Sequence, residues 1–374
     1  MSQIQNTIKL ICIIYIFPYI NFYNKYKNIE NYLDFCNRVT LSGIKSFESV
    51  ENPKISIISP VYNREKYILR FLSSIQNQSF KDIEILFVDD FSLDNSLKLI
   101  EFLQKKDKRI KLIKNKKNKG TFISRNIGIL KSKGKYLMIP DPDDILTKNS
   151  LQSLYNFSEK NKYDIIRFNI YLGKGVLNHQ AYVDALESRS INQPELTTYL
   201  FYGLGRLTLI DYNISNKFIR RELLIKVLNH IKSIYLSLYM VYFEDGLILF
   251  ILHRLAKSYY FLKKVLYYYV KNKHSITSFD YNSLFLKSIF YYLKFVYLNS
   301  KNTKVERGMT NYNIYNLCKG HKVKDKFIVK KEDYDLFSFT LLNLLKNKFI
   351  TIENKKYLNE LKEELFKLFP KKNK

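Results

Sequence analysis

The sequence predicts an α/β fold in which helices flank a mostly parallel sheet. Short apolar runs rich in β-branched and aromatic residues alternate with segments of helical spacing. This alternation is typical of parallel strands joined by right-handed helical crossovers. Most of the apolar runs also end directly in polar or acidic residues, and folds of this class bind ligands at the carboxyl edge of the sheet.

The first half of the chain carries the clearest pattern. We expect strands at residues 55–59, 83–88, 110–113 and 136–139, and helices at residues 65–78, 97–105 and 121–130. Asn63, the Asp89–Asp90 pair and Asp141 follow three of these strands. Because the carboxyl ends of parallel strands meet at one edge of the sheet, we expect a single site there.

The most distinctive stretch is residues 134–146, GKYLMIPDPDDIL, in which an apolar run ends in Asp141, Asp143 and Asp144. These acids stand out in a chain with 62 Lys and Arg against 34 Asp and Glu. Carboxylate oxygens so placed suit Mg²⁺ or Mn²⁺, which share their remaining ligand positions with phosphate. The alternative is a solvated turn before a helix, with Asp144 stabilised by the helix dipole.

The net charge of +28 predicts attraction to anions. A nucleotide diphosphate, an anionic membrane surface and a generally basic solvated surface all explain this charge. We do not expect nucleic acid, because the basic residues are scattered and the sequence has no zinc knuckle or RNA-binding signature. Three widely separated cysteines give neither a disulfide framework nor a metal-binding spacing.

Residues 8–23, IKLICIIYIFPYINFY, are strongly apolar but shorter than a comfortable bilayer span of about 20 residues. This segment is expected either to associate with a membrane, as a signal sequence or short anchor, or to pack on the domain as a helix. Location at the endoplasmic reticulum or Golgi membrane and location in the cytoplasm both stay open.

The second half is expected to begin with a helix at residues 151–160 and a strand at 163–169. Glu244 and Asp245 precede an apolar helix at residues 246–256, and residues 265–271 read as an aromatic strand. Amphipathic spacing predicts helices at residues 284–297, 334–345 and 357–368.

Four segments in order, ISIISPVYN, EILFVDDFSLDNS, NKGTFISRNIGI and GKYLMIPDPDD, resemble the nucleotide-binding half of family 2 glycosyltransferases, which have the GT-A fold. The sequence departs from the family pattern at Phe91, where the family usually has Gly, and at Pro142 within the acidic motif. The resemblance implies an N-terminal apolar segment and linker at 1–53, a GT-A domain at 54–280 and a helical C-terminal region at 281–374.

The resemblance also implies roles for individual residues. Pro60, Tyr62, Asn63 and Glu65 would line the base and ribose pocket, Asp90 would bind the base edge, and Arg125 and Asp143 would approach the diphosphate. Asp141 and Asp143, with Asp144 as a further candidate, would hold Mn²⁺ or Mg²⁺. Asp245 would act as the general base, the segment at 216–221 would cross near the active site, and His274 would lie in a loop over the donor.

These roles together predict an inverting, metal-dependent glycosyltransferase. It would move a sugar from a nucleotide-diphosphate donor, a UDP-sugar, to a glycan, lipid or protein acceptor. The sequence shows no P-loop, GxSxG or HExxH motif that would favour another chemistry. An alternative from a different class is a catalytically inactive module of the same fold that binds a nucleotide-sugar.

Overall fold

We describe the chain from a computed structural model of its 374 residues. The described residues are 36, 38–172, 188–193, 213–231, 239–240, 242 and 244–270, with the single positions 288, 291, 292, 295, 355 and 359. The membrane segment expected at 8–23, His274 and most of the helices expected after residue 281 lie outside these ranges. Among the described residues, no helix has the length and apolar character needed to cross a bilayer.

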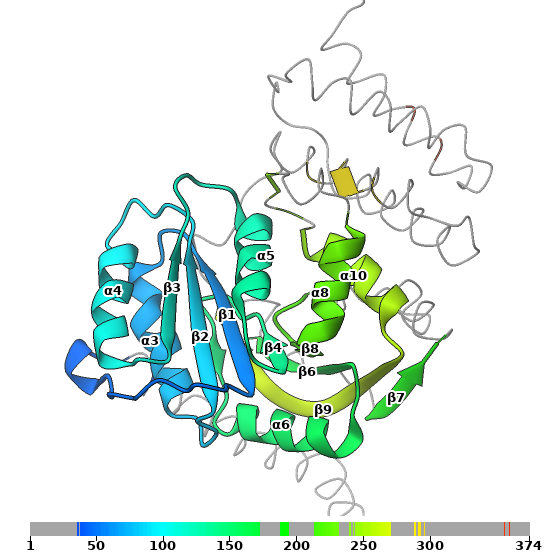
Figure 1. Ribbon diagram of the computed structural model, residues 1–374, viewed down its shortest axis with the longest axis horizontal. Helices are drawn as coiled ribbons and strands as arrows, with labels where there is room; N and C mark the ends of the chain where they lie inside the picture. The colour runs from blue at the N-terminus through cyan, green and yellow to red at the C-terminus, as the bar shows by residue number, and fades with distance from the viewer. Residues whose placement is uncertain are drawn as a thin grey trace, which may run out of the picture.

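The described residues form one mixed sheet with helices on both faces (Figure 1). Its strands are β1 (Ile55–Val61), β2 (Ile83–Asp89), β3 (Ile110–Lys114), β4 (Tyr136–Met138), β5 (Ile145–Leu146), β6 (Ile165–Leu172), β7 (Arg189–Asn192), β8 (Lys217–Arg220) and β9 (Ser258–Tyr269). The helices are α3 (Glu65–Gln76), α4 (Ser96–Lys106), α5 (Thr121–Lys131), α6 (Ser150–Asn161), α8 (Arg221–His230) and α10 (Glu244–Leu255).

The strand order is β3-β2-β1-β4-β8-β6-β9-β5, with β7 paired to β9. Strands β1 to β4 are parallel to their neighbours within this group, and β6 is parallel to β9. The chain steps from β1 through β2 to β3 and then returns to place β4 on the other side of β1. The order therefore reverses between β1 and β4, and such switch points are where open α/β sheets bind ligands.

Two apolar cores cover the two faces of the sheet. One packs α3, α4 and α6 against the sheet, and the other packs α5, α8 and α10 (Figure 1). Helix α5 approaches β1 closely at Gly128, where a Cβ atom would collide with the side chain of Ile58. This close approach holds α5, and with it Arg125, directly over the switch point.

The expected α/β fold is confirmed, and the first four strands lie within a residue or two of their expected bounds. The differences fall in the second half. Strand β9 starts at Ser258 rather than residue 265, and α10 starts at Glu244 rather than residue 246. The pattern also missed β5, β7 and β8, of which β8 runs antiparallel between β4 and β6.

The end of the segment expected to be a linker packs on the domain. Ile44 is 5% exposed and lies in the core with α3. The side chain of Gln76 bonds the backbone of Lys45 in both directions, accepting its N–H at 2.9 Å and donating to its carbonyl at 3.0 Å. The Arg109 guanidinium lies 3.5 Å from the centre of the Phe47 ring. Residues 44–47 are therefore part of the folded unit.

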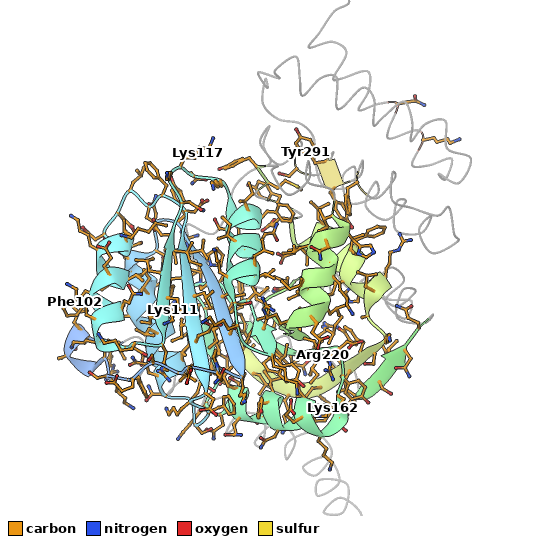
Figure 2. The ribbon with its side chains drawn as sticks, in the orientation of Figure 1. Phe102, Lys111, Lys117, Lys162, Arg220 and Tyr291 are labelled. Atoms are coloured by element: carbon orange, nitrogen blue, oxygen red, sulfur yellow. The ribbon has the colours of Figure 1, made fainter. Side chains whose placement is uncertain are left out.

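Labelled residues mark the two ends of the sheet (Figure 2). Lys117 lies in the loop that follows β3 and marks the carboxyl edge of the first four strands. Arg220 and Lys162 lie toward the opposite end, where the Arg220 guanidinium donates to the Lys162 carbonyl at 2.7 Å. Asn63, Asp90 and Asp141, which follow β1, β2 and β4, belong to the carboxyl edge that Lys117 marks.

Candidate active site

The acidic turn between β4 and β5 gives its carboxylates different environments. The Asp144 side chain is buried, and its two oxygens accept hydrogen bonds from the Tyr267 hydroxyl at 2.6 Å and the Val270 N–H at 2.9 Å. Burial, with Asp143 and Asp141 nearby, raises the pKa of Asp144 well above its usual range. Asp144 thus anchors the turn to β9, and because both of its oxygens accept hydrogen bonds, Asp141 and Asp143 are the stronger candidates for metal ligands.

Asp141 is the accessible acid of this turn, with its side chain 35% exposed. Its backbone N–H donates to the Tyr267 hydroxyl at 3.1 Å, so a strand far along the chain fixes its position. Asp143 is less exposed, and its carboxylate lies 3.8 Å from the Arg64 Nε atom. Arg70 also donates to the Asp143 carbonyl.

Asp141 and Asp143 fit a divalent cation by the chemistry of their donor atoms. Both offer hard carboxylate oxygens on one turn at the switch point. Mg²⁺ usually binds through one or two carboxylates and completes its shell with phosphate and water. Within the ranges that the structure describes, no three or more His, Cys, Asp and Glu side chains gather as a metal-binding group. Two carboxylates would therefore leave the remaining ligand positions to the diphosphate and water.

Arg125 of α5 lies at the centre of a group of acids. Its Nη2 atom donates to Asp141 at 2.9 Å, and its Nη1 atom donates to Glu244 at 3.2 Å and to Asp245. The two latter acids open helix α10, where the helix dipole favours negative charge. The sheet edge thus brings Asp141 and Asp245 to the same guanidinium, although about a hundred residues separate them.

Residues 213–217 border the same acids. The Ile214 N–H donates to Asp245 at 3.1 Å, and the Ser215 hydroxyl lies 3.5 Å from Asp141. The buried Lys217 ammonium donates to the Asn213 carbonyl at 2.7 Å and lies close enough to Asp245 to favour its charged form. The structure therefore places the start of the segment at 216–221 beside the acids, as the sequence led us to expect.

Two of the acids around Arg125 have raised pKa values, chiefly because they are buried. Burial and the nearby Asp245 raise the pKa of Glu244 to about 8. Burial also raises the pKa of Asp245, although Arg125 and the Ile214 hydrogen bond oppose the shift. Burial lowers the Arg125 pKa, but attraction to Asp245 and Asp141 outweighs it, and the guanidinium stays charged.

Asp90 organises the loop before α5. It is buried, and its carboxylate accepts hydrogen bonds from the Asn115 amide at 2.8 Å, the Lys119 N–H at 2.9 Å and the Gly120 N–H at 2.7 Å. Gly120 has a φ of 86°, a backbone conformation that glycine adopts without strain. Asp90 therefore shapes the start of the helix that carries Arg125.

Two exposed tyrosines border this loop. Tyr62, at the end of β1, is 40% exposed, and Tyr239 is 44% exposed. A Cβ atom on Gly120 would lie 3.3 Å from the Tyr239 ring. Burial, together with Asp90 and Tyr62 nearby, raises the pKa of Tyr239. Together with Phe91, which is 49% exposed, these two rings offer aromatic surface beside Asp90.

The other residues expected in the base and ribose pocket join two loops. The Asn63 amide oxygen accepts from the Leu93 N–H at 2.8 Å. The Glu65 carboxylate accepts from the Asn95 N–H at 2.8 Å, while Asp94 accepts from the Glu65 N–H at 3.1 Å. Pro60 is buried within β1 opposite Val88. The loops after β1 and β2 thus form one hydrogen-bonded rim.

Sequence reasoning missed three contributors: Tyr267, Tyr239 and the ion pair between Arg125 and Glu244. It placed Lys217 near the site only as part of the segment at 216–221. Tyr267 lies in an aromatic strand whose partner in the sheet no local pattern reveals. Glu244 is next to Asp245 in the sequence, so its presence in the group could have been suspected. The remaining contacts depend on long-range packing.

The geometry first defines a class of protein. A parallel sheet with a switch point between β1 and β4, followed by an acidic turn and an antiparallel strand, is the GT-A fold. The S. aureus TarS fragment 1–349, in a crystal structure with UDP-GlcNAc, superposes with a TM-score of 0.61 at 20% identity, covering 84% of this chain and 89% of that one. A structure of the same fragment with UDP has a TM-score of 0.60 at 18% identity over the same shares of the two chains.

A family model also matches the sequence. Residues 56–228 match the model of glycosyl transferase family 2, and this match confirms the resemblance found in the sequence. An uncharacterized glycosyltransferase of Haemophilus influenzae is 41% identical over 109 residues, which are 29% of this chain and 44% of the relative.

Two further relatives carry more specific names. The glycosyltransferase GlyG of Streptococcus pneumoniae is 33% identical over 117 residues, 31% of this chain and 39% of GlyG. A poly(ribitol-phosphate) beta-glucosyltransferase of Bacillus spizizenii is 40% identical over 115 residues, 30% of this chain and 18% of that relative. The chain thus matches less than half the length of each of these relatives.

Proposed function

We propose that the protein is an inverting glycosyltransferase. It transfers a sugar from a UDP-sugar to a hydroxyl group of a glycan, lipid or protein acceptor with Mn²⁺ or Mg²⁺. The observation that carries the proposal is the meeting of Asp141 and Asp245 around Arg125 at the switch point of the sheet. The family 2 domain and the UDP-GlcNAc bound by the TarS fragment support it.

Asp245 is the proposed general base. As the acceptor oxygen bonds to the anomeric carbon, its proton passes to Asp245, and the bond from that carbon to the diphosphate oxygen breaks with its electron pair leaving on UDP. The raised pKa of Asp245 makes it a stronger base than an exposed aspartate. With Asp245 as the base and the acceptor oxygen attacking directly, the reaction is a single displacement, which inverts the configuration at the anomeric carbon.

The donor would lie at the carboxyl edge of the sheet, between the loops that follow β1 and β2 and the acidic turn that follows β4. Tyr62 offers an exposed ring for the base, and Asp90 shapes the loop beside it. Asp141 and Asp143 would hold the cation, which neutralises negative charge on the departing diphosphate when it is bound. Arg64, near Asp143, adds positive charge on the same side.

The test combines donor binding with turnover. Thermal shift against a panel of UDP-sugars, with and without Mn²⁺, should show metal-dependent stabilisation, because a ligand of the folded state raises its stability. Asp245→Asn should keep this donor binding and lower the rate of sugar transfer about 10²- to 10⁴-fold, which is what general bases contribute. Lack of a shift with every donor would contradict the proposal.

The same experiment separates an enzyme from an inactive module. An inactive nucleotide-sugar-binding module would show donor stabilisation but neither transfer nor donor hydrolysis by the intact protein, and Asp245→Asn would change nothing. Release of UDP with a donor and Mn²⁺, lost in Asp245→Asn, supports the transferase.

A further inference from the structure

Arg125 is buried beneath the acids rather than exposed to a ligand. Its side chain is 4% exposed, and both terminal nitrogens are engaged with carboxylates. Within the described part of the chain, its Nε atom has no hydrogen-bond partner. The burial of the guanidinium and its ion pairs leave little of it for a diphosphate to contact. This geometry differs from the diphosphate contact that the family resemblance implies.

The acids that Arg125 binds come from separate parts of the chain. Asp141 follows β4, whereas Glu244 and Asp245 begin α10. Arg125 itself is fixed by α5, which packs closely on β1 at Gly128. A planar guanidinium presents its N–H groups at fixed angles, so it can set the separation of the carboxylates that it bridges.

A second bridge joins the same two acids from the other side. The oxygen of Asp245 that does not face Arg125 accepts the Ile214 N–H at 3.1 Å, and the second oxygen of Asp141 lies 3.5 Å from the Ser215 hydroxyl. Asp141 and Asp245 are therefore held between α5 and the segment at 214–215. Each acid has one oxygen on each bridge.

We propose that Arg125 is a positioning residue that fixes the separation between the metal-binding turn and the general base, and that it does not contact the donor. The catalytic part of this inference rests on the proposed function. The positive charge of Arg125 next to Asp141 also weakens the attraction of the metal-binding turn for a cation. Removing that charge should therefore strengthen the binding of metal alone while it disorganises the site.

Three variants of the full chain test this role. Arg125→Met removes the charge and the bridge, and Arg125→Lys keeps the charge but replaces the planar fork with one ammonium group. Arg220→Met is the matched control, because the Arg220 guanidinium also pairs with an aspartate, Asp164 at 3.4 Å, but lies toward the other end of the molecule from Lys117 (Figure 2). Each variant is measured for UDP affinity by calorimetry, for Mn²⁺ affinity without nucleotide, and for kcat and KM.

The expected results differ among the variants. Arg125→Met should lower kcat about 100-fold, since small displacements of reacting groups have effects of this size. UDP affinity should stay within about threefold, and Mn²⁺ alone should bind roughly tenfold more tightly, because a unit charge near a partly buried site is worth at least that factor. Arg125→Lys should also lower kcat but leave Mn²⁺ affinity unchanged. Arg220→Met should change none of these quantities.

Two outcomes would overturn the proposal. A loss of UDP affinity of more than tenfold in Arg125→Met, with uridine affinity unchanged, would show a direct diphosphate contact. Unchanged kcat and unchanged Mn²⁺ affinity would show that the bridge positions nothing. If Arg125→Met fails to fold, Arg125→Lys still decides, because a positioning role requires a loss of kcat without a change of KM. If the wild type binds no donor, the proposed function fails, while the Mn²⁺ comparison still tests the charge effect.

Discussion

At the ends of β1 and β2, carboxylates accept hydrogen bonds from backbone N–H groups, whereas beside β4 and α10 they crowd around Arg125. Asp90 and Asp94 belong to the first region, and hydrogen bonds lower the pKa of Asp94 although burial opposes them. Glu244 and Asp245 belong to the second, where burial raises their pKa values. In the first region hydrogen bonds favour the charged form of Asp94, whereas in the second burial favours the protonated forms of Glu244 and Asp245. The first region is thus suited to hold a ligand and the second to do chemistry.

The largest expected effect in this comparison is on Asp90. Replacing it by Ala would leave the Lys119 and Gly120 N–H groups without their acceptor in a buried loop. We expect Asp90→Ala to lower the free energy of unfolding by about 3 kcal/mol, since hydrogen bonds to buried charges are worth that much together. Urea denaturation measures the change. Asp82→Ala, at an exposed aspartate just before the start of β2 and so at the opposite end of the strand from Asp90, is the control and should change stability little.

In the second region, the contribution of Glu244 to stability should fall as pH rises. Its pKa rises from 4.5 to about 8 in the folded state, so the folded protein binds a proton more tightly than the unfolded chain between these values. Stability from this group is therefore present at low pH and is lost as pH rises from about 4.5 to 8. Glu244→Gln should remove that loss and be more stable than wild type by about 2 kcal/mol at pH 8. Urea denaturation at pH 5 and pH 8 measures the free energy of unfolding of both proteins. An equal change in this free energy between the two pH values would contradict the expectation.

Asp94 sharpens the contrast because its pKa moves down. Its oxygens accept the Ser96 N–H at 2.9 Å and the Glu65 N–H at 3.1 Å, and so cap α4 and α3 together. The stability that Asp94 contributes is present above the normal aspartate pKa. It is lost as pH falls through the lowered pKa of Asp94 in the folded state. Asp94→Ala should cost about 1 kcal/mol at pH 7, as for other helix caps, and this cost should shrink as pH falls below the normal aspartate pKa. A cost that does not change with pH would mean that the charge is unimportant.

The smallest effect is expected at Phe91, in the same first region. Phe91 has a φ of 66°, which is the left-handed conformation that the family's usual glycine adopts freely. The turn is thus kept although the residue differs. Phe91→Gly should relieve this strain, partly offset by the freedom glycine adds to the unfolded chain, for a gain below about 1 kcal/mol. Leu93→Gly, nearby and more exposed but without a positive φ, should lose stability instead.

Local pattern was enough to predict the strands β1 to β4, the helices between them and the convergence of Asn63, Asp90 and Asp141 at one edge. These features depend on residues close in sequence and on the general geometry of parallel sheets. The antiparallel insertion of β8 and the contact of Arg125 with Glu244 depend on how distant elements pack, which periodicity does not encode. Asp144 shows the same limit, because only the position of Tyr267 reveals that its oxygens are already bonded.

The long strand β9 has a consequence for any shortened version of this protein. Its Tyr267 hydroxyl ties Asp144 to the backbone of Asp141, yet the family match stops at residue 228. A fragment trimmed to the matched region would retain both aspartates in its sequence and lose the strand that holds their turn, together with α10. A piece that keeps these contacts must extend past residue 270, and because Tyr292 and Phe295 pack on α10, gene truncations or fusions should be cut beyond residue 295.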